Sequence, residues 1–270
     1  MILVNGAPAE SVAATDRGLA YGDGVFRTLL VREGRPLCWA RHYRRLAHDC
    51  AALALPAPEE RLLREELARA APRAGEWVAK IIVTRGSGPR GYAPPPSPEP
   101  TRIVSVSPAP RYPADLAREG VRLHLCETRL ALQPRLAGIK HLNRLENVLA
   151  RAEWSDPGVP EGLMLDAEGN AIGGTMTSLF IVENGSLVAP RLDRCGIAGV
   201  TRERVMEAAQ ARAVACREER VPFARLLAAE EVLLVNSVVG AWRVRECAGR
   251  KWAKAAVAAC VREWLDETED

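Results

Sequence analysis

The stretch RLAGIKHLNRLENVLARAEW, residues 135–154, contains Lys140, one of only four lysines in the sequence. Lys and Arg together number 37, so nearly every basic side chain is an arginine. Arginine supplies charge and bidentate hydrogen bonds at least as well as lysine, but only lysine readily loses its proton and acts as an amine nucleophile. Lys140 is therefore a candidate nucleophile. The alternative is an ordinary solvated charge, which is what we expect of Lys251 and Lys254 in a helix.

The composition is that of a globular protein with one large domain or two smaller ones. The 270 residues are 48% hydrophobic and 26% charged, which is ordinary for a soluble protein. The net charge is only +3, with acids and bases interspersed, so no basic tail or stripe indicates a nucleic acid or an anionic membrane surface as partner. An anionic ligand must therefore be bound by a local site.

The seven cysteines, at 38, 50, 126, 195, 216, 247 and 260, are odd in number, widely spaced and without a CxxC pair. This pattern predicts reduced, mostly buried thiols, and no disulfide framework or zinc site. The opening MILVNGAPAE has no charged region followed by an apolar core, and no run of about eighteen apolar residues occurs. We expect a cytoplasmic protein.

The first half of the chain alternates strand and helix patterns. Strands are expected at 1–6, 76–86 and 101–110, with a hairpin around Glu33-Gly34. Apolar residues at helical spacing predict helices over 40–55 and 58–71. The prolines and glycines of 86–100 predict a loop, and a second proline-rich patch follows at residues 107–115.

The second half shows a similar mixture. The patterns predict strands at 121–129, 161–169, 177–190 and 231–239, and helices at about 143–154, 201–215, 222–229 and 251–265. The fold class is therefore α/β or α+β in two lobes. We expect an N-terminal α+β domain at 1–110, a linker at 111–118 and a larger C-terminal domain at 119–270.

Three local patterns suit a phosphate group. Gly196 and Gly199 precede a predicted helix that contains Thr201 in its first turn, where free N–H groups and the helix dipole favour an anion; a tight turn with a Thr N-cap is the alternative. Asn236 and Ser237 place small hydrogen-bonding side chains at the C-terminal end of a predicted buried strand. The alternative is that they only terminate the strand.

The third pattern is a pair of arginines. Arg44 and Arg45 lie about one hundred degrees apart on a predicted helix, so one should face inward and bind an anion or a protein carboxylate. The histidines show no metal-ligand spacing, so no metal site is expected. The sequence also has no GxSxG elbow and no GxGxxG turn after a strand, which removes the usual support for a serine hydrolase or a dinucleotide-binding protein. An amine nucleophile, an arginine and a helix N-terminus are the parts that hold a phosphorylated aldehyde cofactor.

Several strings together resemble the fold type IV (class IV) pyridoxal-phosphate enzymes. They are TDRGLAYGDGVFRTLLV (15–31), HYRRL (42–46), TRGSGPRGY (84–92), LAGIKHLNRLENVLAR (136–151), GIAGVTRERV (196–205) and LLVNSVVGAW (233–242). The family includes branched-chain and D-amino-acid aminotransferases and 4-amino-4-deoxychorismate lyase. RGSGPRGY and AGIKHLNRLE most resemble the lyase members, which release p-aminobenzoate and pyruvate in folate biosynthesis.

The resemblance implies a cofactor, a fold and site residues. It implies pyridoxal 5'-phosphate (PLP) linked covalently to Lys140, with its phosphate bound by Arg45, Gly199, Val200, Thr201 and Ser237. Tyr21, Arg90, Tyr92 and Asn236 are expected near the substrate. It implies a two-lobed chain with a barrel-like C-terminal domain, acting on aminodeoxychorismate as a homodimer. A class IV aminotransferase and a non-catalytic PLP-binding module are the alternatives.

One position departs from the family pattern. The family carries a Glu that pairs with the pyridine nitrogen in a string like xEGxxSNLF, whereas this chain reads NAIGGTMTSLF and has Gly173 there. Another acid such as Glu168, a neutral pyridine, or reduced activity could account for the difference. A weaker electron sink should hinder a transaminase more than a lyase whose product is aromatic.

Overall fold

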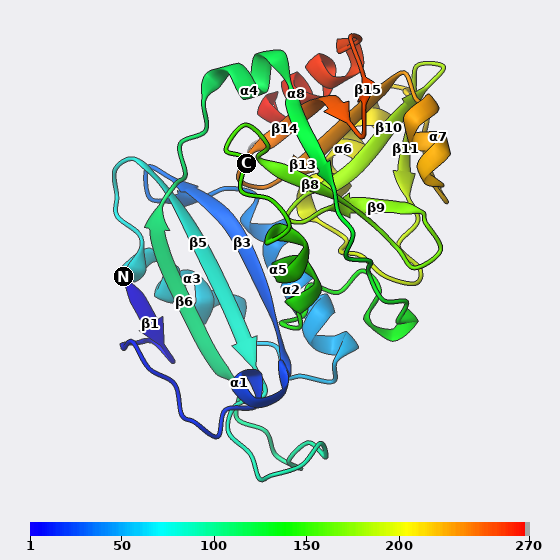
Figure 1. The fold of residues 1–270 in the computed structure, drawn as a ribbon. Coiled ribbons are helices and arrows are strands. Elements are labelled where there is room, and N and C mark those ends of the chain that lie inside the picture. The colour runs from blue at the N-terminus through cyan, green and yellow to red at the C-terminus, as the bar shows by residue number, and fades with distance from the viewer. Residues whose placement is uncertain (268–270) are drawn as a thin grey trace. The chain divides into compact units, whose positions relative to one another are not determined.

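The computed structural model describes residues 1–267, which divide into two units (Figure 1). Met1–Arg111 and Ile139–Asn143 form the first unit; Tyr112–Gly138 and the chain from Arg144 form the second. The segment containing Lys140 thus groups with the N-terminal residues. The domain boundaries expected from the sequence, at 1–110, 111–118 and 119–270, stay a prediction. The short helix α4 (Ala114–Glu119) overlaps the expected linker, and residues 268–270 of the expected C-terminal domain lie outside the described residues.

The first unit contains a six-stranded antiparallel sheet of order β2-β1-β6-β5-β3-β4. Its strands are β2 (Ala7–Pro8), β1 (Ile2–Val4), β6 (Thr101–Pro108), β5 (Glu76–Thr84), β3 (Gly24–Arg32) and β4 (Arg35–Pro36). Glu33 and Gly34 join β3 to β4 with φ of 49° and 73°, the paired positive values of a tight hairpin turn. Alternate residues of β3 are buried, so one face of the sheet carries the core.

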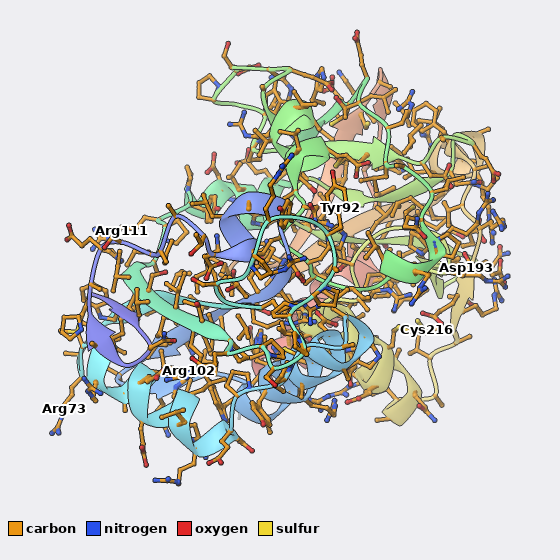
Figure 2. All side chains as sticks on the ribbon, turned by 90° about the horizontal axis from the view of Figure 1, so that it is seen from below. Arg73, Tyr92, Arg102, Arg111, Asp193 and Cys216 are labelled. Carbon is orange, nitrogen blue, oxygen red and sulfur yellow. The ribbon has the colours of Figure 1, made fainter. Side chains whose placement is uncertain are left out.

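Helices α2 (Trp39–Ala52) and α3 (Glu60–Ala70) cover that face (Figure 1). Leu46 of α2 and Leu63 of α3 pack against Leu29 and Ile81 of the sheet in one buried cluster. Burying each such side chain stabilises the fold by roughly 1.5 to 3 kcal/mol. Arg102 of β6, labelled in Figure 2, donates to Glu66 of α3 at 2.8 Å and ties the helix to the sheet.

The second unit is built on a closed barrel. Strands pair around the ring β10-β13-β14-β7-β8-β9, and β9 returns to β10 through Gly173 and Ser178. The ring strands are β7 (Val121–Leu125), β8 (Glu161–Leu165), β9 (Ala171–Gly174), β10 (Ser178–Glu183), β13 (Glu231–Asn236) and β14 (Gly240–Cys247). Outside the ring lie β11 (Ser186–Pro190), β12 (Cys216–Glu219) and β15 (Arg250–Lys251).

Further helical elements belong to the second unit. They are the 3₁₀ turn η1 (Pro134–Leu136) and helices α5 (Leu145–Arg151), α6 (Val200–Ala211), α7 (Phe223–Ala228) and α8 (Ala256–Glu267). The α6 and α8 helices bury Val205 and Val261 in a cluster with Phe180 of β10.

Most predicted elements are confirmed, with several differences. The short helix α1 (Arg17–Tyr21) and strands β9, β12 and β14 were not predicted. Strand β14 contains three charged residues, which weaken its apolar pattern in sequence. The final helix begins at Ala256, so the expectation of a helix around Lys251 and Lys254 was wrong: Lys251 lies in β15, and Lys254 pairs with Glu230 before the helix starts.

The cysteines are free, as predicted. Cys260 is exposed, Cys216 is half-buried and the other five are buried. Within residues 1–267, no helix has the length and apolar character needed to cross a bilayer, and no group of His, Cys, Asp and Glu has the geometry of a metal site.

Candidate active site

Lys140 is half-buried in the segment Ile139–Asn143, next to the start of β3. Its backbone N–H donates to Asp49 Oδ2 at 3.0 Å, and its carbonyl accepts from the Phe26 N–H at 3.0 Å. Its Nζ lies 4.6 Å from the centre of the Phe26 ring. Hydrogen bonds on both sides of the residue therefore fix the main chain from which the amine extends.

Arg45 lies on α2, and its exposure agrees with the prediction for the arginine pair. Arg44 is exposed and Arg45 is half-buried, while the neighbouring Leu46 is 1% exposed. The carbonyl of Arg45 accepts from Arg27 Nη2 at 3.3 Å. Lys140 and Arg45 thus belong to the same unit, and both are tied to β3 through their main chains.

The second unit presents the N-terminus of α6. Gly199 is the N-cap residue, in extended conformation and with no side-chain cap, so Thr201 lies within the first turn and the alternative of a Thr N-cap is wrong. The Thr201 side chain is buried, and its Oγ1 lies 3.1 Å from Ser237 Oγ. The twelve-residue helix thus combines the positive end of its dipole with two hydroxyl groups, a combination that suits a phosphate.

The turn before this helix is held from within the second unit. Gly196, at φ 86°, accepts from the Gly138 N–H at 3.0 Å, and the Ala198 N–H donates back to Gly138 at 2.9 Å. The pair of bonds fixes the path of the chain into Gly199 and Val200. Val200 itself is 3% exposed and anchors the first turn.

Gly173 lies in β9, paired with Met164 of β8 and Ser178 of β10. A Cβ built at Gly173 would lie 2.8 Å from the Thr177 carbonyl oxygen. The backbone of Thr177 therefore already fills the space that a side chain at position 173 would need. The exposed Glu168 accepts from Arg194 at 2.6 Å and Arg220 at 3.2 Å in the turn before β9. These ion pairs argue against Glu168 as the acid at a pyridine nitrogen.

A carboxylate that the sequence analysis did not single out holds the loop after Gly173. Glu161, fully buried at the start of β8, accepts from the N–H groups of Gly162, Thr175 and Met176 and from the hydroxyls of Thr175 and Thr177. Five donors satisfy a buried carboxylate well. Glu161 is thus committed to fixing the β9–β10 loop.

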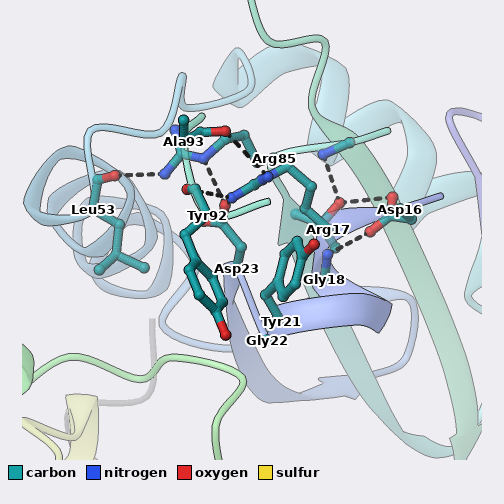
Figure 3. A network of polar contacts seen from close by, with 12 residues as sticks. Asp16, Arg17, Gly18, Tyr21, Gly22, Asp23, Leu53, Arg85, Tyr92 and Ala93 are labelled. Carbon is teal, nitrogen blue, oxygen red and sulfur yellow. Dashed lines mark hydrogen bonds and ion pairs between the residues drawn. The ribbon is translucent and has the colours of Figure 1, made fainter. Parts of the chain in front are cut away.

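The predicted substrate residues Tyr21 and Tyr92 lie together in the first unit (Figure 3). Their ring centres are 5.5 Å apart, and the Tyr21 hydroxyl accepts from the Gly91 N–H at 3.0 Å. Tyr92 is 87% exposed, and Arg90 is exposed in the same loop. The loop therefore presents an aromatic and a cationic side chain at the surface.

A buried arginine missed in the sequence holds this loop. Arg17 donates to the carbonyls of Gly91 at 2.8 Å and Tyr92 at 2.9 Å, and its Nε donates to Asp23 at 2.9 Å (Figure 3). Asp23 also accepts from Arg85 at 2.8 Å. Burial raises the pKa of Asp23, but its hydrogen bonds with Arg85 and Arg17 outweigh this and lower it. The loop 88–95 is thus anchored although it contains no regular element.

Asn236 has a structural role. Its Oδ1 accepts from the N–H groups of Val238 and Val239 at 2.8 Å, and its Nδ2 donates to the Met176 carbonyl at 3.2 Å. The side chain closes the turn from β13 to β14 and leaves Ser237 beside Thr201. A contact of Asn236 with substrate stays a prediction.

Comparison with known proteins identifies the class. The family model for amino-transferase class IV matches residues 24–247, so this chain belongs to the class IV aminotransferase family, whose cofactor is PLP. The predicted family and fold type are therefore confirmed.

Particular relatives are lyases. Aminodeoxychorismate lyase of Vibrio harveyi is 35% identical over 240 residues, 89% of each chain. The crystal structure of 4-amino-4-deoxychorismate lyase from Pseudomonas aeruginosa superposes with a TM-score of 0.94 at 48% identity and covers 99% of both chains. The bifunctional aminodeoxychorismate lyase / D-amino acid transaminase of Mycobacterium tuberculosis is 27% identical, over 94% of this chain and 91% of its own.

Each unit by itself presents residues that suit one end of PLP. A half-buried lysine on a fixed main chain suits the aldehyde, and the uncapped N-terminus of α6 with Thr201 and Ser237 suits the phosphate. The position of the ring-nitrogen acid does not fit the family pattern, because Gly173 has no side chain.

Proposed function

We propose that this protein is a PLP-dependent aminodeoxychorismate lyase that converts 4-amino-4-deoxychorismate to p-aminobenzoate and pyruvate for folate biosynthesis. The observation that carries the proposal is the placement of Lys140, a half-buried lysine whose main chain is bonded on both sides. The likeness to the Vibrio harveyi and Pseudomonas aeruginosa lyases over most of the chain supports the substrate.

Lys140 would carry the cofactor, and Arg45, the N–H groups after Gly199, Thr201 and Ser237 would bind its phosphate. When bound, PLP supplies an electron sink for the substrate carbon that carries the amino group. Lys140 Nζ takes the proton from C4 of the substrate, and the C3–O bond to the enolpyruvyl group breaks. Nζ then gives a proton to the methylene carbon of the departing group, which leaves as pyruvate. The remaining ring is aromatic p-aminobenzoate, and its aromaticity supplies driving force.

Gly173 supports a lyase over a transaminase as the principal activity. Without a carboxylate at this position, the pyridine nitrogen lacks the charged partner that strengthens the electron sink. Elimination that produces an aromatic ring depends less on that sink than amino-group transfer does. The bifunctional Mycobacterium tuberculosis relative keeps transamination as the second candidate.

The test is to incubate the PLP-loaded protein with 4-amino-4-deoxychorismate and measure p-aminobenzoate by chromatography and pyruvate by a coupled assay. We expect equal amounts of the two products, and none from Lys140→Ala. Faster amino transfer from D-alanine or L-leucine to 2-oxoglutarate would instead favour an aminotransferase. Bound cofactor without either reaction would indicate a non-catalytic module.

We also propose that the protein is a homodimer, as the family resemblance implies. Helix α5 supports this: Leu145, Val148 and Leu149, spaced to lie on one side of the helix, are 69%, 60% and 54% exposed. Exposed apolar faces of this kind suit packing against a second copy. Light scattering should give twice the 29.4 kDa chain mass, and Leu149→Glu should shift it toward the monomer. A fully active wild-type monomer would refute the dimer.

We also propose that the protein is located in the cytoplasm.

A further inference from the structure

A buried ion pair lies beneath the lysine in the first unit. Arg27 of β3 donates through Nη2 to Asp49 Oδ2 of α2, and the two side chains are 3% and 1% exposed. Removing both charges from water costs free energy that their attraction only partly returns, so a buried ion pair is weak evidence of stabilisation. A pair of apolar side chains of similar volume would maintain the fold at least as well. The charges therefore call for another explanation.

The pair bonds to the main chain at both candidate cofactor residues. Asp49 Oδ2 accepts from the Lys140 N–H at 3.0 Å, and Arg27 Nη2 donates to the Arg45 carbonyl at 3.3 Å. Two polar side chains thus connect the main chain of the lysine with that of the arginine. The adjacent residue of β3, Phe26, donates its N–H to the Lys140 carbonyl at 3.0 Å.

The Lys140 main chain depends on these contacts. Residues 139–143 form no regular strand: an isolated bridge joins His141 to Val25, the Leu142 N–H donates to the Gly24 carbonyl at 2.9 Å, and the Lys140 N–H donates to the Asp49 carboxylate. The carboxylate of Asp49 supplies the acceptor that a strand would otherwise provide. The other oxygen, Oδ1, faces His48 Nδ1 at 3.3 Å, which leaves Oδ2 to bind both Arg27 and Lys140.

The arrangement leaves the buried guanidinium of Arg27 incompletely hydrogen-bonded. Its Nε is among the buried nitrogen and oxygen atoms of the described chain that have no hydrogen-bond partner. Burial lowers the pKa of its guanidinium, Asp49 opposes this, and Arg45 adds to it. Burying the Arg27–Asp49 pair is unfavourable, and the bonds that the pair makes in return hold the main chains of Lys140 and Arg45.

We propose that Arg27 and Asp49 form a positioning pair: Asp49 fixes the main chain of Lys140 by accepting its N–H, and Arg27 holds that carboxylate in place and links it to α2 at Arg45. The inference rests on the proposed function, since it assigns Lys140 and Arg45 to the cofactor. Neither residue of the pair is assigned a contact with substrate. A displacement of about 1 Å at a reacting group can cost about a hundredfold in rate, so a small loss of order should be measurable.

Two double variants separate positioning from folding. Arg27→Met with Asp49→Leu removes both charges and the acceptor, whereas Arg27→Met with Asp49→Asn removes both charges and keeps an oxygen that accepts from the Lys140 N–H. The Leu and Asn side chains are similar in size, so packing is matched. If the Leu variant does not fold, Arg27→Met with Asp49→Ala takes its place.

Four readouts apply. They are the thermal midpoint, the amide exchange of the peptide containing Lys140 in the cofactor-free protein, the rate at which PLP becomes reducibly attached to Lys140, and the kcat and KM of p-aminobenzoate formation. We expect all folded variants to unfold within a few degrees of the wild type. The Leu variant should exchange the Lys140 amide at least tenfold faster, attach PLP at least tenfold more slowly, and lose kcat with KM changed less than about threefold. The Asn variant should recover most of each loss.

Equal exchange, attachment and kcat in the Leu variant and the wild type would overturn the proposal, as would equal losses in the Leu and Asn variants. The proposed function fails separately, if the wild type neither attaches PLP to Lys140 nor forms p-aminobenzoate. Amide exchange does not depend on that outcome.

Discussion

The Thr201 hydroxyl lies 3.1 Å from the Ser237 hydroxyl, and this contact joins the first turn of α6 to the end of β13. The two residues are separated by 36 positions in sequence. The contact places two hydroxyl groups at the positive end of a helix: one donates to the other, and the remaining O–H can donate to a phosphate oxygen.

Thr201→Val removes one hydroxyl while keeping the branched shape. A lost hydrogen bond of about 0.5 to 1.5 kcal/mol corresponds to a roughly two- to tenfold weaker affinity for PLP, measured by titration of the cofactor-free protein. Thr201→Ser retains the hydroxyl and should stay close to the wild type. Unchanged affinity in the Val variant would mean that the phosphate binds elsewhere.

Arg45→Ala should weaken PLP binding before it changes the chemical step. A charge-assisted phosphate contact contributes about 1.5 to 3 kcal/mol, so affinity should fall about tenfold or more. The matched control is Arg44→Ala, because Arg44 is the exposed neighbour on the same helix. Similar affinities in the two variants would assign Arg45 a structural role.

Gly173→Glu should not create a better electron sink. The new Cβ would meet the Thr177 carbonyl at 2.8 Å, and overpacking of this kind costs about 1 to 3 kcal/mol. We expect a lower thermal midpoint and less bound PLP. Gly173→Ala serves as the control for size without charge, and should show a smaller loss. A stable Glu variant with faster amino transfer would show that the backbone accommodates the acid after all.

Glu153 makes stability depend on pH. Burial raises its pKa, but bonds from Thr128, the Glu127 N–H and His124 outweigh this and lower it from 4.5 to about 2. Because the folded pKa lies below the unfolded one, the contribution is present above about pH 4.5 and is lost as the pH falls toward 2.

The matching variant is Glu153→Gln. At about 1.4 kcal/mol per pKa unit the upper limit is about 3 kcal/mol, and the 17% exposure of the side chain reduces the expected loss at pH 7 to about 1 to 2 kcal/mol. Urea unfolding should show that the difference in free energy of unfolding between the wild type and Glu153→Gln shrinks as the pH falls from 4.5 toward about 2. A difference independent of pH would mean that the carboxylate charge does not contribute.

Candidate residues could be predicted where the signal lies within one short stretch of sequence. The scarcity of lysine made Lys140 a candidate, helical spacing indicated that one of Arg44 and Arg45 faces inward, and glycines before an apolar helix indicated the N-terminus of α6. Each of these signals depends on residues within a few positions of one another. The hairpin at Glu33-Gly34 was found in the same way. The choice of Lys140 and Arg45 came from the family resemblance.

Contacts between distant residues could not be predicted. Asp49 meets Arg27 22 positions away and Lys140 91 positions away, and no local pattern contains that information. A partial signal existed: Asp49 shares the buried face of α2 with His42 and Leu46, so its charge needed a partner. Glu161 is similar, since four of its five donors come from a loop that begins beyond the next strand.

The central claim is that Lys140 carries the cofactor, and borohydride reduction of the PLP-loaded protein followed by peptide mapping tests it most directly. The pyridoxyl group should be found on the peptide containing Lys140, at about one group per chain, and should be absent from Lys140→Ala. Lys80, Lys251 and Lys254 are exposed and serve as internal controls. A label on one of these three with Lys140 unmodified would contradict the account.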